Sequence, residues 1–305
     1  GLERVAFART RRMDELLGLD GDDLDLCGAE DASDDGRDVS GVARVSARDC
    51  DAAEFARAYV ATSTPAVLTD CAGEAWWPSW VTVDFLAERY ADAAVGIDGK
   101  KGRLGDFVER LDVEERYLRN VHLDDLLTEA DASRLVLPPP LGANRVADHD
   151  VPRAWTRWFE LFLLPRRCKG YPFLHRDMCC TSAYSLQLAG SKQFTLYAPD
   201  DAQYLYALPP SYCRSAIEDG GRSANLAAYP LFAKARPRHV RLDPGDLLFL
   251  PPDWWHTTRP TGDAHSLTLG GNYVTPETEE LFAASFAEFR SFQELSSLGA
   301  ARILR

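Results

Sequence analysis

Two histidines and an aspartate have the types and spacing of a metal site. The segment "YPFLHRDMCC", residues 171–180, places His175 and Asp177 two residues apart in an apolar stretch typical of a β-strand. Residues i and i+2 of a strand point to the same side, so this imidazole and this carboxylate can bind neighbouring positions on one ion. A surface strand that alternates by chance would give the same pattern, and the motif alone does not decide between the two.

A third candidate ligand comes much later in the chain. The segment "LDPGDLLFLPPDWWHTT", residues 242–258, holds a P-G-D turn, an apolar strand, a second turn and then His256. Two histidines and one carboxylate form the facial set of non-haem Fe(II) oxygenases, which leaves three metal positions open. The remaining histidines fit surface or capping positions better: His122, His149, His239 and His265.

One lysine is a candidate for anion binding. Lys192 begins an apolar strand in "LAGSKQFTLYAPD", residues 188–200. Its ammonium group is either exposed at the start of the strand or directed inward. In the second case it needs an anionic partner to offset the loss of solvation, and a dicarboxylate co-substrate would provide one.

The elements that must position these residues lie mainly in the second half of the chain. From about residue 155, short strands alternate with Gly, Pro and Asp turns, as in a sandwich or a jelly roll, a group that includes cupin-type barrels. Residues 80–130 mix short helices with short strands. We therefore expect a mainly β protein with flanking helices, a double-stranded β-helix with N-terminal α/β elements and a C-terminal helix.

This pattern divides the chain into three parts. Residues 1–48 form an N-terminal extension, in which the acidic segment 20–38 is a flexible linker or exposed loop. Residues 49–275 form the main domain, with its barrel core at about 155–275, and residues 276–305 form a helical segment. This helix has an aromatic stripe that either packs on its own domain or forms a homodimer interface: Phe282, Phe286, Phe289 and Phe292.

Composition limits the partners and the compartment. The net charge of −13 argues against a nucleic-acid partner and is compatible with a basic protein or peptide, or with acidity for solubility alone. No apolar run is long enough to span a membrane. Seven cysteines without a C-x-x-C pair favour an intracellular compartment, the cytoplasm or nucleus. Because the chain begins at Gly1 and not at methionine, a trimmed targeting segment stays possible.

In combination, the motifs resemble the JmjC-domain 2-oxoglutarate oxygenases. They are most similar to the small hydroxylase branch, which includes the asparaginyl hydroxylase of hypoxia-inducible factor. The similarity covers roughly residues 155–275 and extends weakly back to "TPAVLTDC" at 64–71. It rests on four motifs: H-R-D at 175–177, G-S-K-Q-F-T-L-Y-A-P-D at 190–200, L-D-P-G-D-L-L-F-L-P-P-D-W-W-H at 242–256 and G-G-N-Y-V at 270–274.

The resemblance implies a metal, two co-substrates and a reaction. His175, Asp177 and His256 would hold Fe(II), with 2-oxoglutarate and O2 as co-substrates. The implied reaction is hydroxylation of an amino-acid side chain in a protein or peptide, with 2-oxoglutarate converted to succinate and CO2. The alternatives are an N-methyl-lysine demethylase, a tRNA-base hydroxylase, and a cupin binding protein without turnover.

The resemblance also assigns a co-substrate pocket. It implies that Lys192 and Tyr117 bind the distal carboxylate of 2-oxoglutarate and that Ser185 faces the same pocket. Asn272 would lie near the other end of the co-substrate. On a plain structural interpretation, Asn272 only satisfies a strand end and Tyr117 belongs to the core.

One position departs from the family pattern. Relatives usually carry Ser or Thr three residues before the first histidine, where its hydroxyl bonds the co-substrate, whereas this chain has Pro172. We expect Tyr171 or Tyr117 to replace that bond, or else a low affinity for the co-substrate.

Overall fold

A computed structural model describes residues 41–97, 100–171, 173–209, 213–218 and 225–303. The expected acidic linker at 20–38 lies outside these residues, as does Pro172. Across the described ranges, no helix combines the length and the apolar character that a membrane crossing requires.

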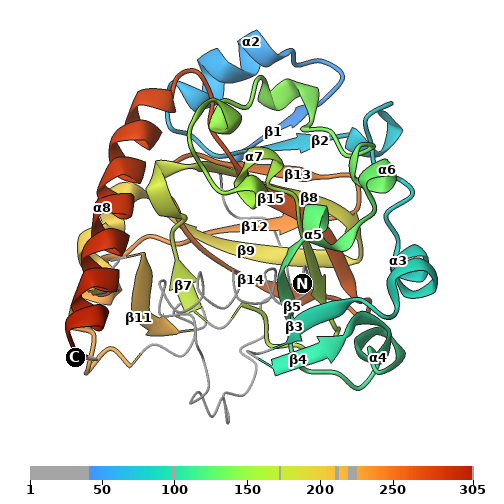
Figure 1. Ribbon diagram of the computed structural model, residues 1–305. Helices are drawn as coiled ribbons and strands as arrows, with labels where there is room; N and C mark the ends of the chain where they lie inside the picture. The colour runs from blue at the N-terminus through green and yellow to red at the C-terminus, as the bar shows by residue number, and fades with distance from the viewer. Residues whose placement is uncertain (1–40, 98–99, 172, 210–212, 219–224, 304–305) are drawn as a thin grey trace.

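Two β-sheets face each other and form a double-stranded β-helix, as the strand pattern predicts (Figure 1). In spatial order, the seven-stranded sheet consists of β1 (Ala43–Ser46), β2 (Ala66–Thr69), β13 (Leu247–Leu250), β8 (Ser182–Ala189), β15 (Ser266–Tyr273), β6 (Glu160–Leu164) and β5 (Leu118–His122). The six-stranded sheet consists of β10 (Ala207–Leu208), β11 (Arg214–Glu218), β7 (Phe173–His175), β14 (Trp255–Thr261), β9 (Ser191–Tyr197) and β12 (Arg238–Leu242). A separate hairpin pairs β3 (Ala94–Ile97) with β4 (Lys100–Arg103).

Alternation along the strands separates the outer core from the space between the sheets. In β8, Tyr184 and Leu186 belong to the large core on the outer face of the seven-stranded sheet. Ala183 faces the other way and packs with Phe194 and Leu196 of β9. This second cluster fills part of the barrel interior with apolar side chains. The predicted metal and co-substrate residues lie in the rest of the interior.

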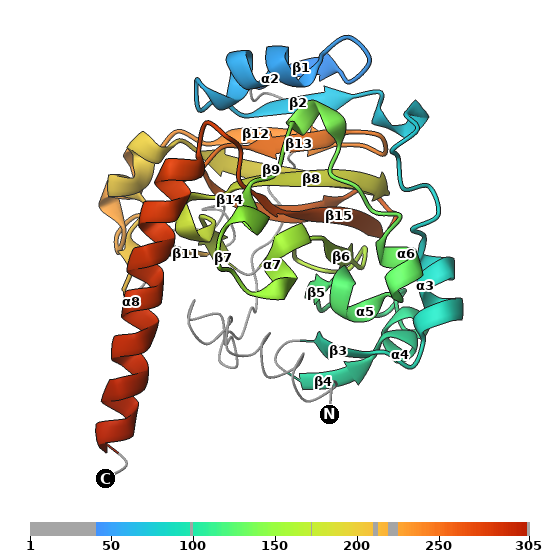
Figure 2. The same ribbon diagram turned by 45° about the horizontal axis from the view of Figure 1, so that its top comes forward.

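Short helices cover the outer face of the seven-stranded sheet (Figure 2). They are α2 (Ala52–Phe55), α3 (Val83–Tyr90), α4 (Leu104–Glu109), α5 (Leu123–Leu126) and α6 (Glu129–Ala132). Helix α7 (Arg153–Arg157) instead places Trp155 in a separate cluster with Trp158. Side-chain caps begin three of these helices, because the Asp51, Thr82 and Thr128 oxygens accept hydrogen bonds from N–H groups of the first turn.

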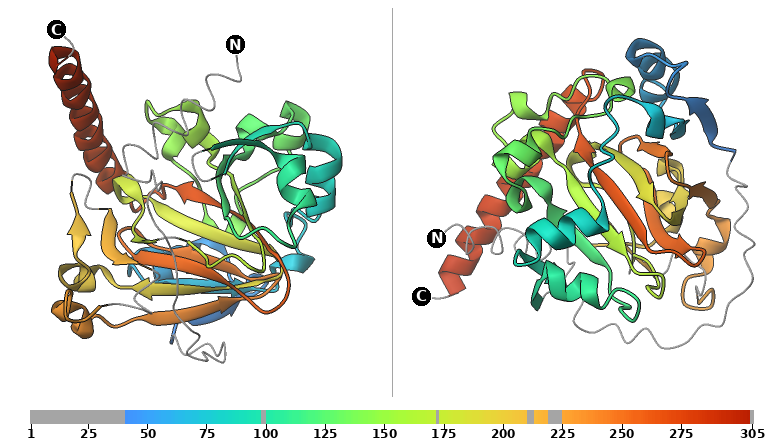
Figure 3. Two further views of the ribbon diagram at one scale, coloured as in Figure 1. Left: turned by 90° about the horizontal axis from the view of Figure 1, so that it is seen from below. Right: turned by 90° about the vertical axis from the view of Figure 1, so that its right-hand side faces the viewer.

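The C-terminal helix α8 (Glu279–Ile303) packs on the domain through the predicted aromatic stripe. Phe282 and Phe286 are buried in a cluster with Trp155, and Phe289 is partly buried there. The side chain of Phe292 lies outside the described residues. The far half of α8 extends beyond the barrel (Figure 3), and a homodimer through this helix stays a prediction.

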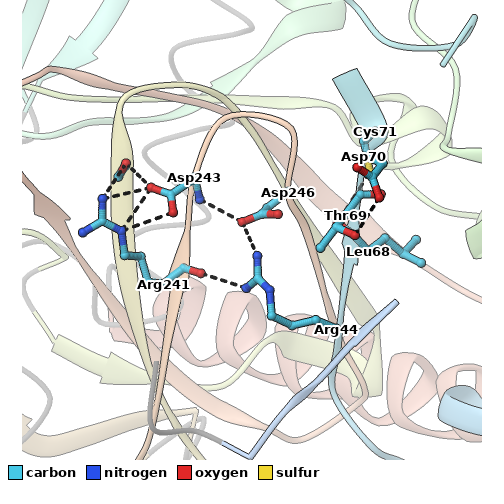
Figure 4. A network of polar contacts seen from close by, with 9 residues as sticks. Arg44, Leu68, Thr69, Asp70, Cys71, Arg241, Asp243 and Asp246 are labelled. Carbon is cyan, nitrogen blue, oxygen red and sulfur yellow. Dashed lines mark hydrogen bonds and ion pairs between the residues drawn. The ribbon is translucent and has the colours of Figure 1, made fainter. Parts of the chain in front are cut away.

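A polar network fixes the turn between β12 and β13 (Figure 4). Arg44 Nη2 forms an ion pair with Asp246 Oδ2 at 2.6 Å, and Arg44 Nη1 donates to the carbonyl of Arg241. Asp246 Oδ2 also accepts from the backbone N–H of Asp243, closing the P-G-D turn that the sequence indicated. The network ties edge strand β1 to the start of β13, the strand that leads toward His256.

A glycine at the entrance to β7 tests this packing. Gly170 has φ +102°, and a Cβ there would collide with the backbone carbonyl oxygen of Thr258 in β14. We expect Gly170→Ala to lower the free energy of unfolding by roughly 3 kcal/mol or more, since strain and a backbone collision add. Gly262→Ala is the matched control, because it shares a left-handed φ of +76° but has open space around it. Gly262→Ala should lower the free energy of unfolding, measured in urea, by only about 1 kcal/mol. Equal losses for the two variants would contradict the close approach of Gly170 to the Thr258 carbonyl.

Candidate metal centre

The six-stranded sheet brings the three candidate ligands together. Strand β14 lies between β7 and β9, with His256 directly opposite His175. Asp177 follows β7 at the start of a 3₁₀ turn, Met178–Cys180. One potential ligand atom from each of the three side chains lies within 4.8 Å of the others. This is the spacing of atoms that can share one metal ion.

The hydrogen bonding of His256 leaves one ring nitrogen free to bind a metal. Its Nδ1 lies 3.1 Å from the carbonyl oxygen of Trp254. A carbonyl can only accept, so Nδ1–H is the donor and Nε2 keeps its lone pair in the neutral ring. Metal-bound histidines are commonly oriented by such a bond to a backbone carbonyl.

His175 is also held as a neutral imidazole. Its ring stacks on Tyr171 with centroids 4.4 Å apart and an angle of 16°. Burial, together with the neighbouring His256, holds the pKa of His175 well below its usual value. Its Nδ1 is buried and has no hydrogen-bond partner within the described residues. Two imidazoles and a carboxylate whose potential ligand atoms lie this close together fit a divalent transition metal.

An ion pair joins the two segments that carry the ligands. Arg176 lies between His175 and Asp177 in sequence, and its Nη1 contacts Asp253 Oδ1 at 2.5 Å. Asp253 occupies the turn before β14 with a left-handed φ of +65°. This charge-assisted bond therefore fixes the distance between the histidine-aspartate motif and the strand of His256.

Lys192 points into the barrel and is 2% exposed. Its Nζ lies 4.7 Å from the centroid of the Phe194 ring and 5.7 Å from that of Phe162. No carboxylate among the described residues forms an ion pair with it, and burial lowers its pKa to about 7. A buried cation between two aromatic rings offers a binding point for an anion.

The other predicted pocket residues line the same interior. Tyr117 is 5% exposed; its ring lies 6.3 Å from the ring of Phe162, which also contacts Lys192. Burial raises the pKa of the Tyr117 phenol. Ser185 is buried on the same side of β8 as Ala183, so it also faces between the sheets.

Asn272 contacts a residue that the sequence did not indicate. Its Nδ2 donates to Thr181 Oγ1 at 2.8 Å, and Thr181 follows the 3₁₀ turn after Asp177. Thr181 is 1% exposed. The pair joins β15 to the segment of the aspartate ligand, a contact that only the strand order produces.

The remaining histidines lie outside the group of His175, Asp177 and His256, and all four are partly buried where the sequence predicted surface or capping positions. His122 precedes α5, with its Nε2 3.4 Å from Glu160 Oε1, and His239 lies in β12, where its Nδ1 is 3.2 Å from Thr195 Oγ1. His149 packs against Phe282, and His265 Nε2 lies 3.2 Å from Asp112.

Comparison with known proteins gives a domain family and several partial relatives. The profile of the cupin-like domain matches residues 170–274. The chain is 39% identical over 91 residues to tRNA wybutosine-synthesizing protein 4 of Aspergillus oryzae, covering 30% of this chain and 8% of that protein. It is 33% identical over 83 residues to Jumonji C domain-containing protein 5 of Drosophila melanogaster, covering 27% and 21%.

A third relative is tRNA wybutosine-synthesizing protein 5 of Mus musculus. The two chains are 42% identical over 73 residues, covering 24% of this chain and 22% of that protein. The chain thus spans between 8% and 22% of the length of these three relatives.

The Arg176–Asp253 ion pair leads to a prediction about metal affinity. Arg176→Met removes the charge but keeps much of the chain length, so Asp253 no longer fixes the turn before β14. We expect the affinity for Mn(II) to fall about 10-fold or more, as for other residues that orient metal ligands. Arg241→Met, which removes an ion pair to Asp243 far from the ligands, is the control. Unchanged Mn(II) titrations for Arg176→Met would show that the pair does not position the ligands.

Proposed function

We propose that this chain is an Fe(II)- and 2-oxoglutarate-dependent dioxygenase that hydroxylates an amino-acid side chain of a protein or peptide. The match of residues 170–274 to the cupin-like domain and the partial similarity to a Jumonji C domain-containing protein support this proposal. The observation that supports this most is the combination of the three-residue ligand set with the buried Lys192 inside one barrel. A metal alone would not require that lysine, whereas a metal with a dicarboxylate co-substrate would use both.

Fe(II), with 2-oxoglutarate and O2, would supply the oxidising chemistry, and 2-oxoglutarate would leave as succinate and CO2. His175, Asp177 and His256 would hold the metal on one side and leave the opposite side for the co-substrates. The Trp254 carbonyl keeps His256 in the tautomer that binds through Nε2.

The barrel interior would orient the co-substrate. Lys192 would pair with its distal carboxylate, in a space where Phe162 and Phe194 exclude water and strengthen the attraction. Asn272, held by Thr181, would contact the end nearer the metal. Selectivity would then depend on which substrate carbon the protein positions at the iron.

A tRNA-base hydroxylase is the second candidate, and a specific observation favours it. Two of the three relatives described above are tRNA wybutosine-synthesizing proteins. The net charge of −13 favours a protein or peptide substrate, since tRNA binding relies on phosphate neutralisation. An N-methyl-lysine demethylase would use the same site, and a cupin binding protein without turnover is the non-enzymatic alternative.

Turnover tests the enzymatic proposal directly. The Fe(II)-loaded protein should convert 2-oxoglutarate to succinate, and His256→Ala should abolish this because one metal ligand is lost. His239→Ala is the control, since His239 lies in β12 outside the ligand set. Succinate formation that survives His256→Ala or iron removal would contradict the proposal.

The mass of the product separates the substrate classes. Peptide extracts and tRNA are incubated in parallel, and a gain of about 16 mass units marks hydroxylation. A gain confined to tRNA would replace the protein substrate with the second candidate. A loss of about 14 mass units in peptides would indicate demethylation.

The depressed pKa of Lys192 predicts a pH dependence. In the protein without co-substrate, the lysine loses its charge as the pH rises through about 7. A bound carboxylate stabilises the charged form and raises its pKa, so binding above that pH takes up a proton. We expect the 2-oxoglutarate affinity of the Mn(II)-loaded protein to be constant below about pH 7 and to fall by up to about tenfold per pH unit above it.

Calorimetry in two buffers of different ionisation enthalpy measures this proton uptake. Lys192→Met should bind 2-oxoglutarate about 100-fold more weakly, or worse, and without the proton uptake. Equal proton uptake by the variant would assign the titration to another group.

A further inference from the structure

Thr258 occupies the barrel wall beside the co-substrate lysine. It lies two residues after His256 in β14, so both side chains face the interior. In the pairing of β14 with β9, Thr258 is opposite Phe194 and Pro260 is opposite Lys192. Thr258 and Lys192 are therefore diagonal neighbours on the same face of the sheet, within reach of one carboxylate.

The Thr258 hydroxyl is buried inside the barrel. The residue is 8% exposed, and the structure gives Oγ1 no partner in any of its described segments. The Tyr117 phenol lies close to this hydroxyl, because its contact with Thr258 opposes the rise in the pKa of Tyr117 that burial causes. Because buried polar groups are normally satisfied, this hydroxyl indicates a missing ligand atom.

The backbone around Thr258 places it next to the segment that departs from the family pattern. Tyr171 immediately precedes Pro172 in the sequence, and its N–H donates to the Thr258 carbonyl at 2.6 Å. Tyr171 itself does not supply the missing hydroxyl, because its ring stacks on His175 and its phenol faces Arg119 at 3.5 Å.

From these contacts, and resting on the proposed function, we infer that Thr258 donates a hydrogen bond to the distal carboxylate of 2-oxoglutarate. Together with Lys192 and Tyr117, it takes the place of the hydroxyl that Pro172 lacks. The hydroxyl serves this carboxylate only, so its loss should not affect ligands that have no such group.

Calorimetric binding to the Mn(II)-loaded protein tests the inference with two ligands. One is 2-oxoglutarate and the other is 2-oxovalerate, which has the same chain length but no distal carboxylate. Thr258→Val keeps the shape and removes the hydroxyl, so the affinity for 2-oxoglutarate should fall about 10-fold or more, as for a lost hydrogen bond to a charged group. Its affinity for 2-oxovalerate should equal that of the wild type. Thr258→Ser should bind both ligands within about threefold of the wild type.

Thr261→Val is the matched control. Thr261 belongs to the same strand and also has a buried hydroxyl without a partner in the described structure, but it faces away from the interior. Its substitution should change neither affinity. If valine at 258 prevents folding, Thr258→Ala removes the same hydroxyl without added bulk.

The outcomes separate this inference from the proposed function. Wild-type affinity of Thr258→Val for 2-oxoglutarate, or an equal loss for both ligands, would overturn the role of Thr258 alone. Failure of the wild-type protein to bind 2-oxoglutarate in the presence of metal would overturn the proposed function and the inference with it. A selective loss for 2-oxoglutarate supports both.

Discussion

The register between β7 and β14 is the constraint on which the site depends. Within the described residues, the two strands pair at one position, His175 opposite His256. A slip of one residue would turn His256 out of the barrel. Two tryptophans oppose such a slip, because Trp254 packs between the sheets while Trp255 is buried in the cluster on the opposite face. The metal site is thus specified by the packing of large apolar residues next to it.

The same packing sets the electrostatics of the interior. Apolar side chains fill one end of the barrel, and Lys192 lies where this cluster ends, against Phe194. Burial of a cation without a carboxylate partner is unfavourable, and the lowered pKa of Lys192 expresses that cost. The binding of an anion would offset it. The interior is therefore less stable than a fully apolar one and is better suited to a ligand, as functional sites commonly are.

The sequence predicted the helices and strands better than it predicted which of them lie side by side. Short strands with Gly, Pro and Asp turns predicted a sandwich or jelly roll, and the helical spacing of Phe282, Phe286, Phe289 and Phe292 predicted the C-terminal helix, because both signals are local. The i, i+2 spacing of His175 and Asp177 predicted that they would lie together, and the structure places His256 beside them. The contact of Asn272 with Thr181 and the position of Thr258 depend on strand order, which pairs segments far apart in the chain. A single sequence carries little information about such pairings.

The net charge of the chain and the charge near the candidate metal ligands differ in sign. The net charge of −13 led us to expect a basic partner. Yet Arg119 lies 5.1 Å from the ring centroid of Tyr171, and Arg214 lies 4.4 Å from that of Phe173, both beside the candidate ligands. A substrate that approaches the metal meets the local potential of these arginines, whereas net charge describes the molecule at long range. The overall acidity is therefore only weak evidence against an anionic substrate.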